Sequence, residues 1–236
     1  MIIGLVGGMG SIATVDYFRR LIDAFPAQKE WDRPRIIIDN RCDIPSRVRG
    51  ILYGEKTKEI VASLIESIQM MIAHKCDYIV LLCNTSHYYL NAIYEQHPGY
   101  EKKIIHIIDL LAQTLNTNNV TRCRLIASEG TYLTKIYDKS LQIYNISYIE
   151  NDERQTRAWI EAVKTHRVTE DIKKDFINTV NNFQEQNVIL GCTELPVLYS
   201  ICKNSIHKNV YDPLECTINY LTKAYYTENN THKHYQ

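Results

Sequence analysis

Short runs of consecutive apolar residues alternate along the chain with longer stretches in which apolar residues recur every three or four positions. The short runs predict buried strands. The periodic stretches predict helices with one apolar face, as at Ile12, Val15, Phe18 and Leu21. The predicted strands are 1–6, 35–38, 78–82, 104–108, 123–127, 143–149 and 188–190, with a short strand or loop from 210. The predicted helices are 11–25, 51–73, 87–94, one from 109, 131–142, 153–164, 169–186, 194–202 and 212–225. This alternation predicts parallel βαβ units and an α/β fold.

The two halves of the sequence resemble each other. Residues 4–18 align with 124–138, and the apolar segment 78–84, which runs into a cysteine, aligns with 187–193. Two matches in the same order, about half a chain apart, indicate an internal duplication. We therefore expect two similar lobes, each with a parallel sheet flanked by helices, related by a pseudo-twofold axis, with the active site in the cleft between them. The expected division is 1–103 with 209–226 as a first lobe, 104–208 as a second lobe, and 227–236 as a loose polar tail.

The candidate chemistry lies where the apolar strands end. Ligands of open α/β sheets bind beyond the carboxyl ends of the strands. Cys83 of the first lobe and Cys192 of the second both lie at such an end, and each precedes a predicted helix, whose free N–H groups favour a thiolate. Two thiols on opposite sides of one carbon suit a reaction in which one thiolate removes a proton and the other thiol returns one to the opposite face. The sequence therefore predicts inversion at a carbon atom.

Composition excludes several other classes. Lys and Arg together number 27, as do Asp and Glu, so the chain has no net positive charge. It therefore lacks the basic excess that is typical of nucleic-acid-binding proteins and of proteins that bind anionic membrane surfaces. No run approaches the roughly 18–20 apolar residues of a membrane span, and the first residues lack the positive charge of a secretory signal. The seven cysteines include no CxxC pair and no zinc-ligand spacing, which predicts reduced thiols, a cytoplasmic location and no metal.

At four motifs the chain resembles the cofactor-independent aspartate/glutamate racemase superfamily, and its aspartate racemase branch in particular. The motifs are Gly7–Gly10 with Ala13-Thr14, Cys83–His87, Ala127–Thr131 and Gly191–Pro196, in the order of the family. The resemblance implies two similar α/β lobes with the site between them, commonly as a homodimer. It also implies racemisation of a small acidic amino acid, aspartate or glutamate, without pyridoxal phosphate or metal. Cys83 and Cys192 match the family's two acid/base cysteines.

The same resemblance implies a set of substrate-binding residues. Arg47, in Pro45-Ser46-Arg47, resembles the arginine that holds the side-chain carboxylate, a task suited to a bidentate guanidinium. Lys164 resembles a lysine offered to a substrate carboxylate. The remaining predicted contacts are Met9, Gly10, Thr14, Asn84, Thr85, Thr131 and Thr193. The polar residues after the two cysteines also fit simple helix caps, so both roles stay open for Asn84, Thr85 and Thr193.

Three other interpretations stay open. A nicotinamide enzyme would use the glycine turn as a dinucleotide fingerprint, with Asp39 on the ribose, but it leaves both cysteine motifs unexplained. A related lyase or isomerase on the same scaffold, or a racemase of broad specificity, would keep the fold but change the pocket. A non-catalytic amino-acid-binding module would keep the motifs without activity. Neither the choice between aspartate and glutamate nor the enantiomer served by each cysteine follows from the sequence.

Overall fold

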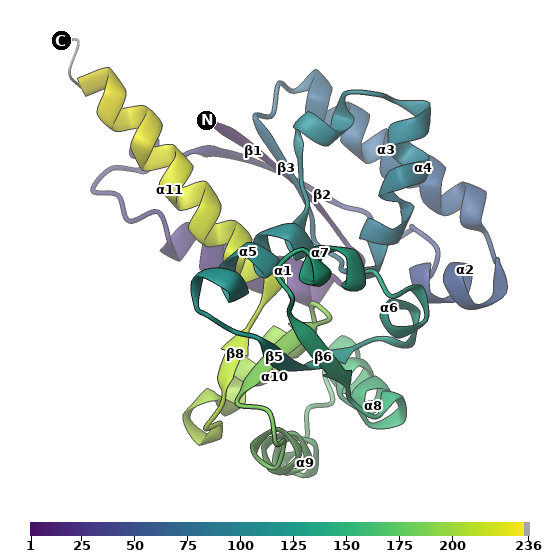
Figure 1. Cartoon of the computed structure of the whole chain (residues 1–236). Helices are drawn as coiled ribbons and strands as arrows, with labels where there is room; N and C mark the ends of the chain where they lie inside the picture. Colours follow the sequence, from purple (N-terminus) through teal and green to yellow (C-terminus); the bar gives the residue numbers. More distant parts are fainter. Residues whose placement is uncertain (234–236) are drawn as a thin grey trace.

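The computed structural model describes residues 1–233 and contains two four-stranded sheets that are parallel throughout (Figure 1). The first sheet has the order β2-β1-β3-β4 and the second has the order β6-β5-β7-β8, so the two sheets have the same topology. The strands of the first sheet are β1 (Ile2–Gly7), β2 (Arg35–Asn40), β3 (Tyr78–Leu81) and β4 (Ile104–Ile105). Those of the second are β5 (Arg122–Ala127), β6 (Ser147–Glu150), β7 (Asn187–Gly191) and β8 (Asn209–Tyr211). The predicted fold class is confirmed.

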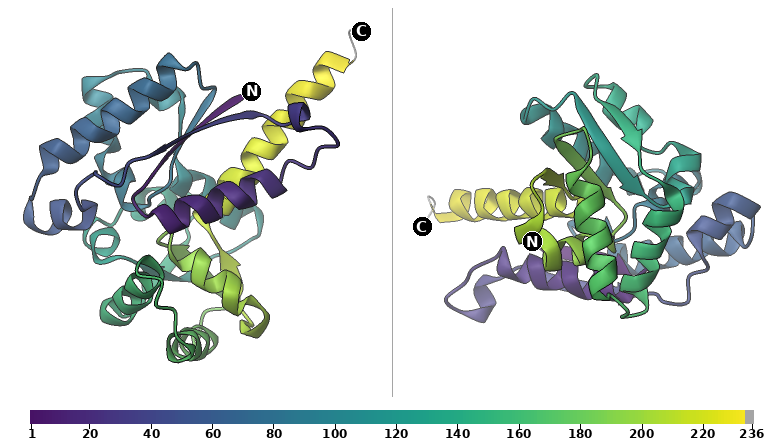
Figure 2. Two further views of the ribbon diagram at one scale, coloured as in Figure 1. Left: turned by 180° about the vertical axis from the view of Figure 1, so that it is seen from behind. Right: turned by 90° about the horizontal axis from the view of Figure 1, so that it is seen from below.

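The helices form layers on both faces of each sheet (Figures 1 and 2). They are α1 (Ser11–Asp23), α2 (Arg47–Tyr53), α3 (Thr57–Ala73), α4 (Leu90–Gln96), α5 (Ile107–Thr117), α6 (Glu129–Thr134), α7 (Asp138–Gln142), α8 (Glu153–Lys164), α9 (Glu170–Asn181), α10 (Leu195–Cys202) and α11 (Pro213–Lys233). Short 3-10 turns lie at Glu30–Asp32, Thr85–Tyr89, Tyr100–Lys102 and Lys203–Ser205. Helices α3 and α4 cover the outer face of the first sheet, and α8, α9 and α10 cover that of the second.

One apolar core joins the two sheets. It contains inward-facing residues of both central strands, such as Leu5 of β1 and Leu125 of β5, together with Tyr17 of α1, Leu111 of α5 and Leu221 of α11, all of them buried. Strand residues alternate between this shared core and an outer core, as the period of two requires: Leu5 faces inward and Val6 faces the α3 side. Helices α1, α5 and α11 therefore lie in a layer that both sheets cover.

Two predicted helices are each broken in the structure. The pattern predicts one helix over 51–73, but α2 ends at Tyr53, and the chain turns through Gly54 (φ 68°) and Lys56 (φ 52°) before α3. The prediction of a single helix over 131–142 is wrong in the same way, because Lys135 has φ 52° between α6 and α7. Left-handed lysines are uncommon, and apolar residues continue at helical spacing across Lys135, so the pattern contains no signal for that break. At the first break Gly54 is a local signal, because glycine commonly occupies the left-handed position that ends a helix, and no apolar residue follows until Ile60.

The two edge strands β4 and β8 belong to other lobes than the sequence predicts, and the C-terminal segment is also different from its prediction. Strand β4 is shorter than the predicted 104–108 and pairs with β3, so it belongs to the first sheet rather than the second. Strand β8 pairs with β7 in the second sheet, although 209–226 is predicted for the first lobe. The alternation of strands and helices orders the elements but does not say which sheet an edge strand joins. The predicted loose tail is helical as far as Lys233, and 234–236 lie outside the described residues.

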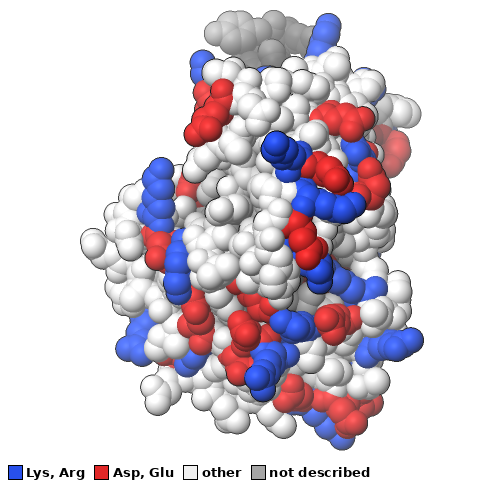
Figure 3. Space-filling view, turned by 90° about the vertical axis from the view of Figure 1, so that its right-hand side faces the viewer, with Lys and Arg blue, Asp and Glu red and all other residues white. Residues whose placement is uncertain are grey.

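Charged side chains are mixed in sign on the face shown in Figure 3, where Lys and Arg alternate with Asp and Glu over the surface. This mixing matches the balanced charge of the sequence and leaves no extended basic surface on that face. None of the helices in residues 1–233 is both long enough and apolar enough to cross a membrane.

Candidate active site

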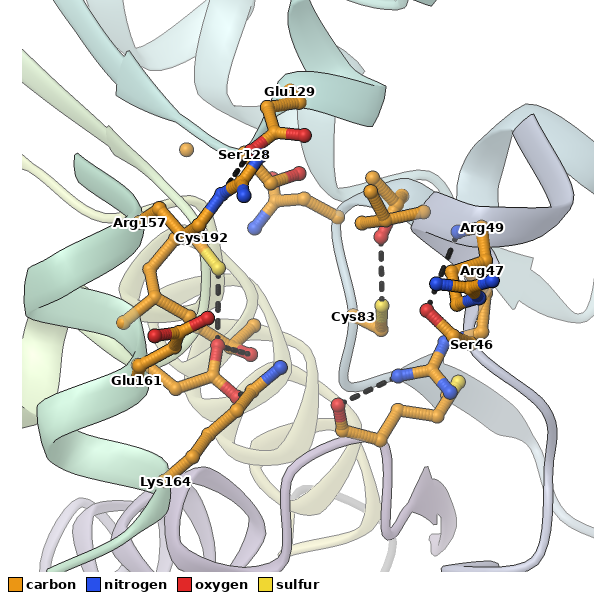
Figure 4. Close-up of a pocket in the computed structure, with 18 of the residues that line it drawn as sticks. Ser46, Arg47, Arg49, Cys83, Ser128, Glu129, Arg157, Glu161, Lys164 and Cys192 are labelled. Carbon is orange, nitrogen blue, oxygen red and sulfur yellow. Dashed lines mark hydrogen bonds and ion pairs between the residues drawn. The ribbon is translucent and has the colours of Figure 1, made fainter. Parts of the chain in front are cut away.

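A cavity of about 380 Å³ lies between the lobes, at the carboxyl ends of the central strands (Figure 4). It is lined by residues that follow β1, β3, β5 and β7, and by side chains of α2 and α8. In both sheets the chain order reverses between the two middle strands, so the loops that follow these strands leave in opposite directions and open a crevice. Both candidate cysteines line this one cavity, and Figure 4 shows Cys83 and Cys192 on opposite sides of it.

Cys83 is buried, and hydroxyl and imidazole groups surround its segment. Its Sγ lies 3.3 Å from Oγ1 of Thr85. Its carbonyl oxygen accepts a hydrogen bond from Oγ of Ser86 at 2.7 Å and lies 3.0 Å from Nδ1 of His87. Burial lowers the pKa of His87 to about 3, so the ring is neutral and its Nδ1–H donates to that carbonyl. His87 therefore stabilises the loop that contains Cys83 through this hydrogen bond, and it does not line the cavity.

Cys192 has a different neighbour. Its Sγ donates a hydrogen bond to Oε2 of Glu194 at 3.0 Å, and Oγ1 of Thr193 lies 3.4 Å from the same oxygen. Desolvation, and then the negative charge of Glu194, raise the pKa of the Cys192 thiol well above its usual value. Nζ of Lys164 lies 3.6 Å from Oε1 of Glu194; burial opposes the charge on the lysine, but the carboxylate still raises the pKa of Lys164. Cys192 is therefore a thiol at neutral pH beside a carboxylate that can accept its proton.

The glycine turn after β1 makes room for that carboxylate. Gly8 has φ 79°, and a Cβ atom there would lie 2.4 Å from the backbone of Arg41, so only glycine fits. A Cβ atom on Gly10 would lie 2.3 Å from Oε1 of Glu194. Gly10 is absent from the residues that line the cavity, whereas Met9, its neighbour in the turn, lines it. The structure thus gives Gly10 a packing role next to Glu194.

Two predicted threonine contacts also lie behind the cavity wall. Thr14 accepts a hydrogen bond from the Gly8 N–H at 3.0 Å and donates one to the Gly10 carbonyl at 2.9 Å, which shapes the turn. Thr131 lies 3.2 Å from the hydroxyl of Ser128, measured between the two Oγ atoms, and is 1% exposed. Neither Thr14 nor Thr131 lines the cavity. Both hydroxyls have partners within their own turns, which the sequence motifs do not reveal.

Arg47 lines the cavity but is largely occupied by backbone carbonyls. It lies at the start of α2 rather than in a loop. Its Nη1 donates to the carbonyls of Ile44 and Pro45, and its Nη2 donates to that of Met9 at 2.7 Å. Its Nε is buried and has no hydrogen-bond partner among the described residues. Arg47 therefore joins the segment before α2 to the glycine turn, and Nε remains as a donor.

The polar residues after each cysteine line the cavity, namely Asn84, Thr85 and Thr193. Asn84 occupies the position before a 3-10 turn but makes no capping hydrogen bond with its side chain. Its Nδ2 is buried and has no partner within the described part of the chain. A cap would have used the side chain on its own turn, so the helix-cap interpretation does not describe Asn84.

Several charged residues at the cavity were not expected from the motifs. Arg49 of α2 makes a two-point ion pair with Glu55, and Arg157 of α8 pairs with Glu129 of α6. The lining residues of α8 are Glu153, Arg157, Ile160, Glu161 and Lys164. Their spacing of three and four places them on one face of α8, so the helical period around Lys164 was the available signal.

Comparison with known proteins places the chain in a family. A family model described as Asp/Glu/Hydantoin racemase matches residues 6–221, and the chain belongs to that family. The aspartate racemase of Picrophilus torridus has a similar structure, with a TM-score of 0.80, 26% sequence identity, and coverage of 95% of this chain and 94% of that chain. A glutamate racemase of Persephonella marina is 25% identical over 195 residues, which cover 76% of this chain and 70% of that protein.

More distant relatives share the fold. An aspartate racemase homologue from Pyrococcus horikoshii has a TM-score of 0.72 at 20% identity, and covers 94% of this chain and 98% of its own. The family match, together with the Picrophilus and Persephonella relatives, confirms two predictions: the resemblance to the aspartate branch of the racemases, and the enzyme class, an amino-acid racemase and hence an isomerase.

Proposed function

We propose that this protein interconverts the L and D forms of an acidic amino acid, aspartate first and glutamate as the alternative, by proton transfer at Cα between Cys83 and Cys192 and without a cofactor. The observation that carries the proposal is the placement of the two thiols. They follow equivalent strands of two sheets with the same topology and lie on opposite sides of one cavity. A substrate between them presents one face of its Cα to each sulfur atom.

The reaction needs one thiolate and one thiol in each turnover. The thiolate takes the proton from Cα, and the opposite thiol gives its proton to the other face as the carbon atom inverts, so the two cysteines exchange protonation states. In the direction in which the Cys83 thiolate removes the Cα proton, Cys192 starts as the thiol and donates its proton to the other face of Cα. The reverse direction needs Cys192 as the thiolate and Cys83 as the thiol: Oε2 of Glu194, at 3.0 Å, accepts the Cys192 proton and passes it to solvent, and Cys83 takes up one proton from solvent, so the total number of protons on the two thiols is unchanged. Fixed positions on both sides of Cα supply the effective molarity of an intramolecular reaction.

The cavity also offers donors for two carboxylates. Asn84, Thr85 and Thr193 lie beside the sulfur atoms and would bind the α-carboxylate, on which negative charge grows as the Cα proton leaves. Nε of Arg47 and the ammonium group of Lys164 would bind the distal carboxylate. A distal acid group thus meets two cations, which favours aspartate or glutamate over an amino acid with an apolar side chain. The similarity to an aspartate racemase of Picrophilus and to a glutamate racemase of Persephonella supports the same two acids.

The presence of a second thiol separates this proposal from a lyase or one-base isomerase on the same scaffold. Such an enzyme needs a single acid/base group, so it gives no reason for Cys83 and Cys192 to face one cavity. The homodimer and the cytoplasmic location remain predictions from the resemblance and from the reduced cysteines.

The test is proton NMR of L-aspartate with the purified, reduced protein in deuterated water, with no added cofactor and with L-glutamate in a parallel sample. Loss of the Cα proton signal together with appearance of the D isomer in a chiral separation supports the proposal. Exchange without inversion would mean that only one cysteine acts as a base. Absence of exchange with both acids would contradict the proposed substrate class. The Cys83→Ala/Cys192→Ala double variant is the control for background exchange.

A further inference from the structure

A phenol from the second lobe contacts an amide at the active site of the first. Oη of Tyr137 donates a hydrogen bond of 2.6 Å to Oδ1 of Asn84. Tyr137 lies between α6 and α7, and Asn84 directly follows Cys83 beyond β3, so this bond connects the two lobes next to one of the two thiols. Tyr137 does not line the cavity, whereas Asn84 does.

The hydrogen bond between Tyr137 and Asn84 is buried. Tyr137 is 1% exposed and Asn84 is 3% exposed, so neither group reaches bulk water. Burial raises the pKa of the Tyr137 phenol well above its usual value, so the phenol stays neutral and keeps its proton. A neutral phenol that donates requires an acceptor, and the amide of Asn84 presents its oxygen.

The contact also decides which end of the amide is left for a ligand. An asparagine side chain has one accepting oxygen and one NH₂ group with two donors. Tyr137 donates to Oδ1, so rotation of the amide by 180° would remove the acceptor of this hydrogen bond and put Nδ2 in its place. Nδ2 is buried and has no hydrogen-bond partner in the described residues, and a buried donor without a partner is costly unless a ligand supplies an acceptor.

We infer that Tyr137 is a positioning residue: it orients the amide of Asn84 across the lobe boundary so that both Nδ2 hydrogens are offered to a substrate carboxylate beside Cys83. The inference rests on the proposed function for the identity of the ligand, but the orientation of the amide can be measured without turnover. Tyr137 itself touches neither the substrate nor the reacting atoms.

The chain contains a matched control for this role. Tyr17 of α1 occupies the position that aligns with Tyr137 in the other half of the sequence. It is also fully buried, and its hydroxyl lies 2.7 Å from Oγ1 of Thr217 of α11, which does not line the cavity. Tyr17→Phe and Tyr137→Phe therefore remove the same atom from two buried phenols, and only the second change deprives a site residue of its partner.

The first experiment records the side-chain amide signals of Asn84 in a ¹H–¹⁵N NMR spectrum of the full chain, identified by their loss in Asn84→Ala. In Tyr137→Phe these signals shift, because Oδ1 has lost its donor, whereas in Tyr17→Phe they stay in place. Unchanged Asn84 signals in Tyr137→Phe would overturn the inference, whatever the activity. If the wild-type protein racemises neither acid but the Asn84 signals shift in Tyr137→Phe alone, the proposed function fails and the positioning role stands.

The second experiment measures kcat/KM for L-aspartate in a double-mutant cycle. An acceptor left unpaired in a buried site predicts that Tyr137→Phe lowers kcat/KM by about 10- to 100-fold in the wild-type background. In the Asn84→Ala background the same change lowers it by less than about twofold, because the partner is already absent. Tyr17→Phe stays within about twofold of wild type. An equal loss from Tyr137→Phe in both backgrounds, or an equal loss in Tyr17→Phe, would assign the effect to general packing and overturn the inference.

Discussion

Two cysteines at equivalent positions of the two sheets have different immediate neighbours. Cys83 lies beside a hydroxyl, that of Thr85, and Cys192 lies beside a carboxylate, that of Glu194. A carboxylate makes it harder to form a thiolate, but it also provides a place for the thiol proton to go. The two directions of proton transfer are therefore chemically unequal, although the two cysteines follow equivalent strands of sheets with the same topology.

Removal of the charge on Glu194 tests this asymmetry. The negative carboxylate raises the pKa of Cys192, so in Glu194→Gln the thiol ionises at a lower pH than in the wild type. The limb of the pH profile of kcat/KM that reports ionisation of Cys192 moves to lower pH, and the other limb stays in place. The measurement is kcat/KM for both enantiomers across the pH range. A profile superimposable on that of the wild type would contradict the role of Glu194.

Loss of either thiol removes one acid/base group, so Cys83→Ala and Cys192→Ala each lower racemisation by at least about 10²- to 10⁴-fold. Cys202→Ala is the matched control, because Cys202 of α10 is buried as Cys83 is, but lies in the core between the second sheet and its outer helices and does not line the cavity. Chiral chromatography after incubation with L-aspartate gives the rates. If either of the first two variants racemises at the wild-type rate, the two-base proposal is wrong.

At the scale of elements, the sequence predicts the type of each segment, helix or strand, more reliably than it predicts the positions at which helices break. The strand that precedes each cysteine and the glycine turn after β1 are predictable, because their apolar runs and glycines are local signals. The end of α2 at Gly54 also has a local signal, a glycine in the left-handed cap position, whereas the left-handed lysines Lys56 and Lys135 have none. The contacts of Arg47 are an example at the site. One carbonyl that Arg47 binds belongs to Met9, which is distant in sequence, so no local sequence pattern predicts this hydrogen bond.

The glycine turn carries a prediction at this scale. Gly10 has an ordinary extended backbone (φ −143°, ψ 128°), so alanine there meets no conformational penalty, only the carboxylate of Glu194. Gly10→Ala therefore displaces Glu194 and lowers kcat by on the order of 10²-fold, the typical cost of an ångström-scale misplacement. Gly99→Ala is the control: its φ of 101° strains alanine, but a Cβ there has nothing within 4 Å. Equal activity of Gly10→Ala and the wild type would refute this account.

At the scale of the whole molecule, the two lobes share one apolar core and cannot unfold independently. Leu111 of α5 lies in this core and is fully buried, so Leu111→Ala destabilises the protein by about 2–5 kcal/mol. The melting curve then shifts as a single transition, seen alike by near- and far-ultraviolet circular dichroism. Leu133→Ala removes the same group from an exposed position and changes stability by less than about 0.5 kcal/mol. Two separated transitions would show that the lobes fold apart.

The matching strand orders of the two sheets have a consequence for the origin of the cavity. A single ancestral half would have left bare the side of its sheet that α5 and α11 now fill together, so it needed a second identical copy to cover it. In such a pair the two thiols had to have the same neighbours, because one gene encoded both. Fusion into one chain removed that constraint. One sulfur atom could then acquire a hydroxyl neighbour and the other a carboxylate neighbour, so that the two acid/base groups of the site differ.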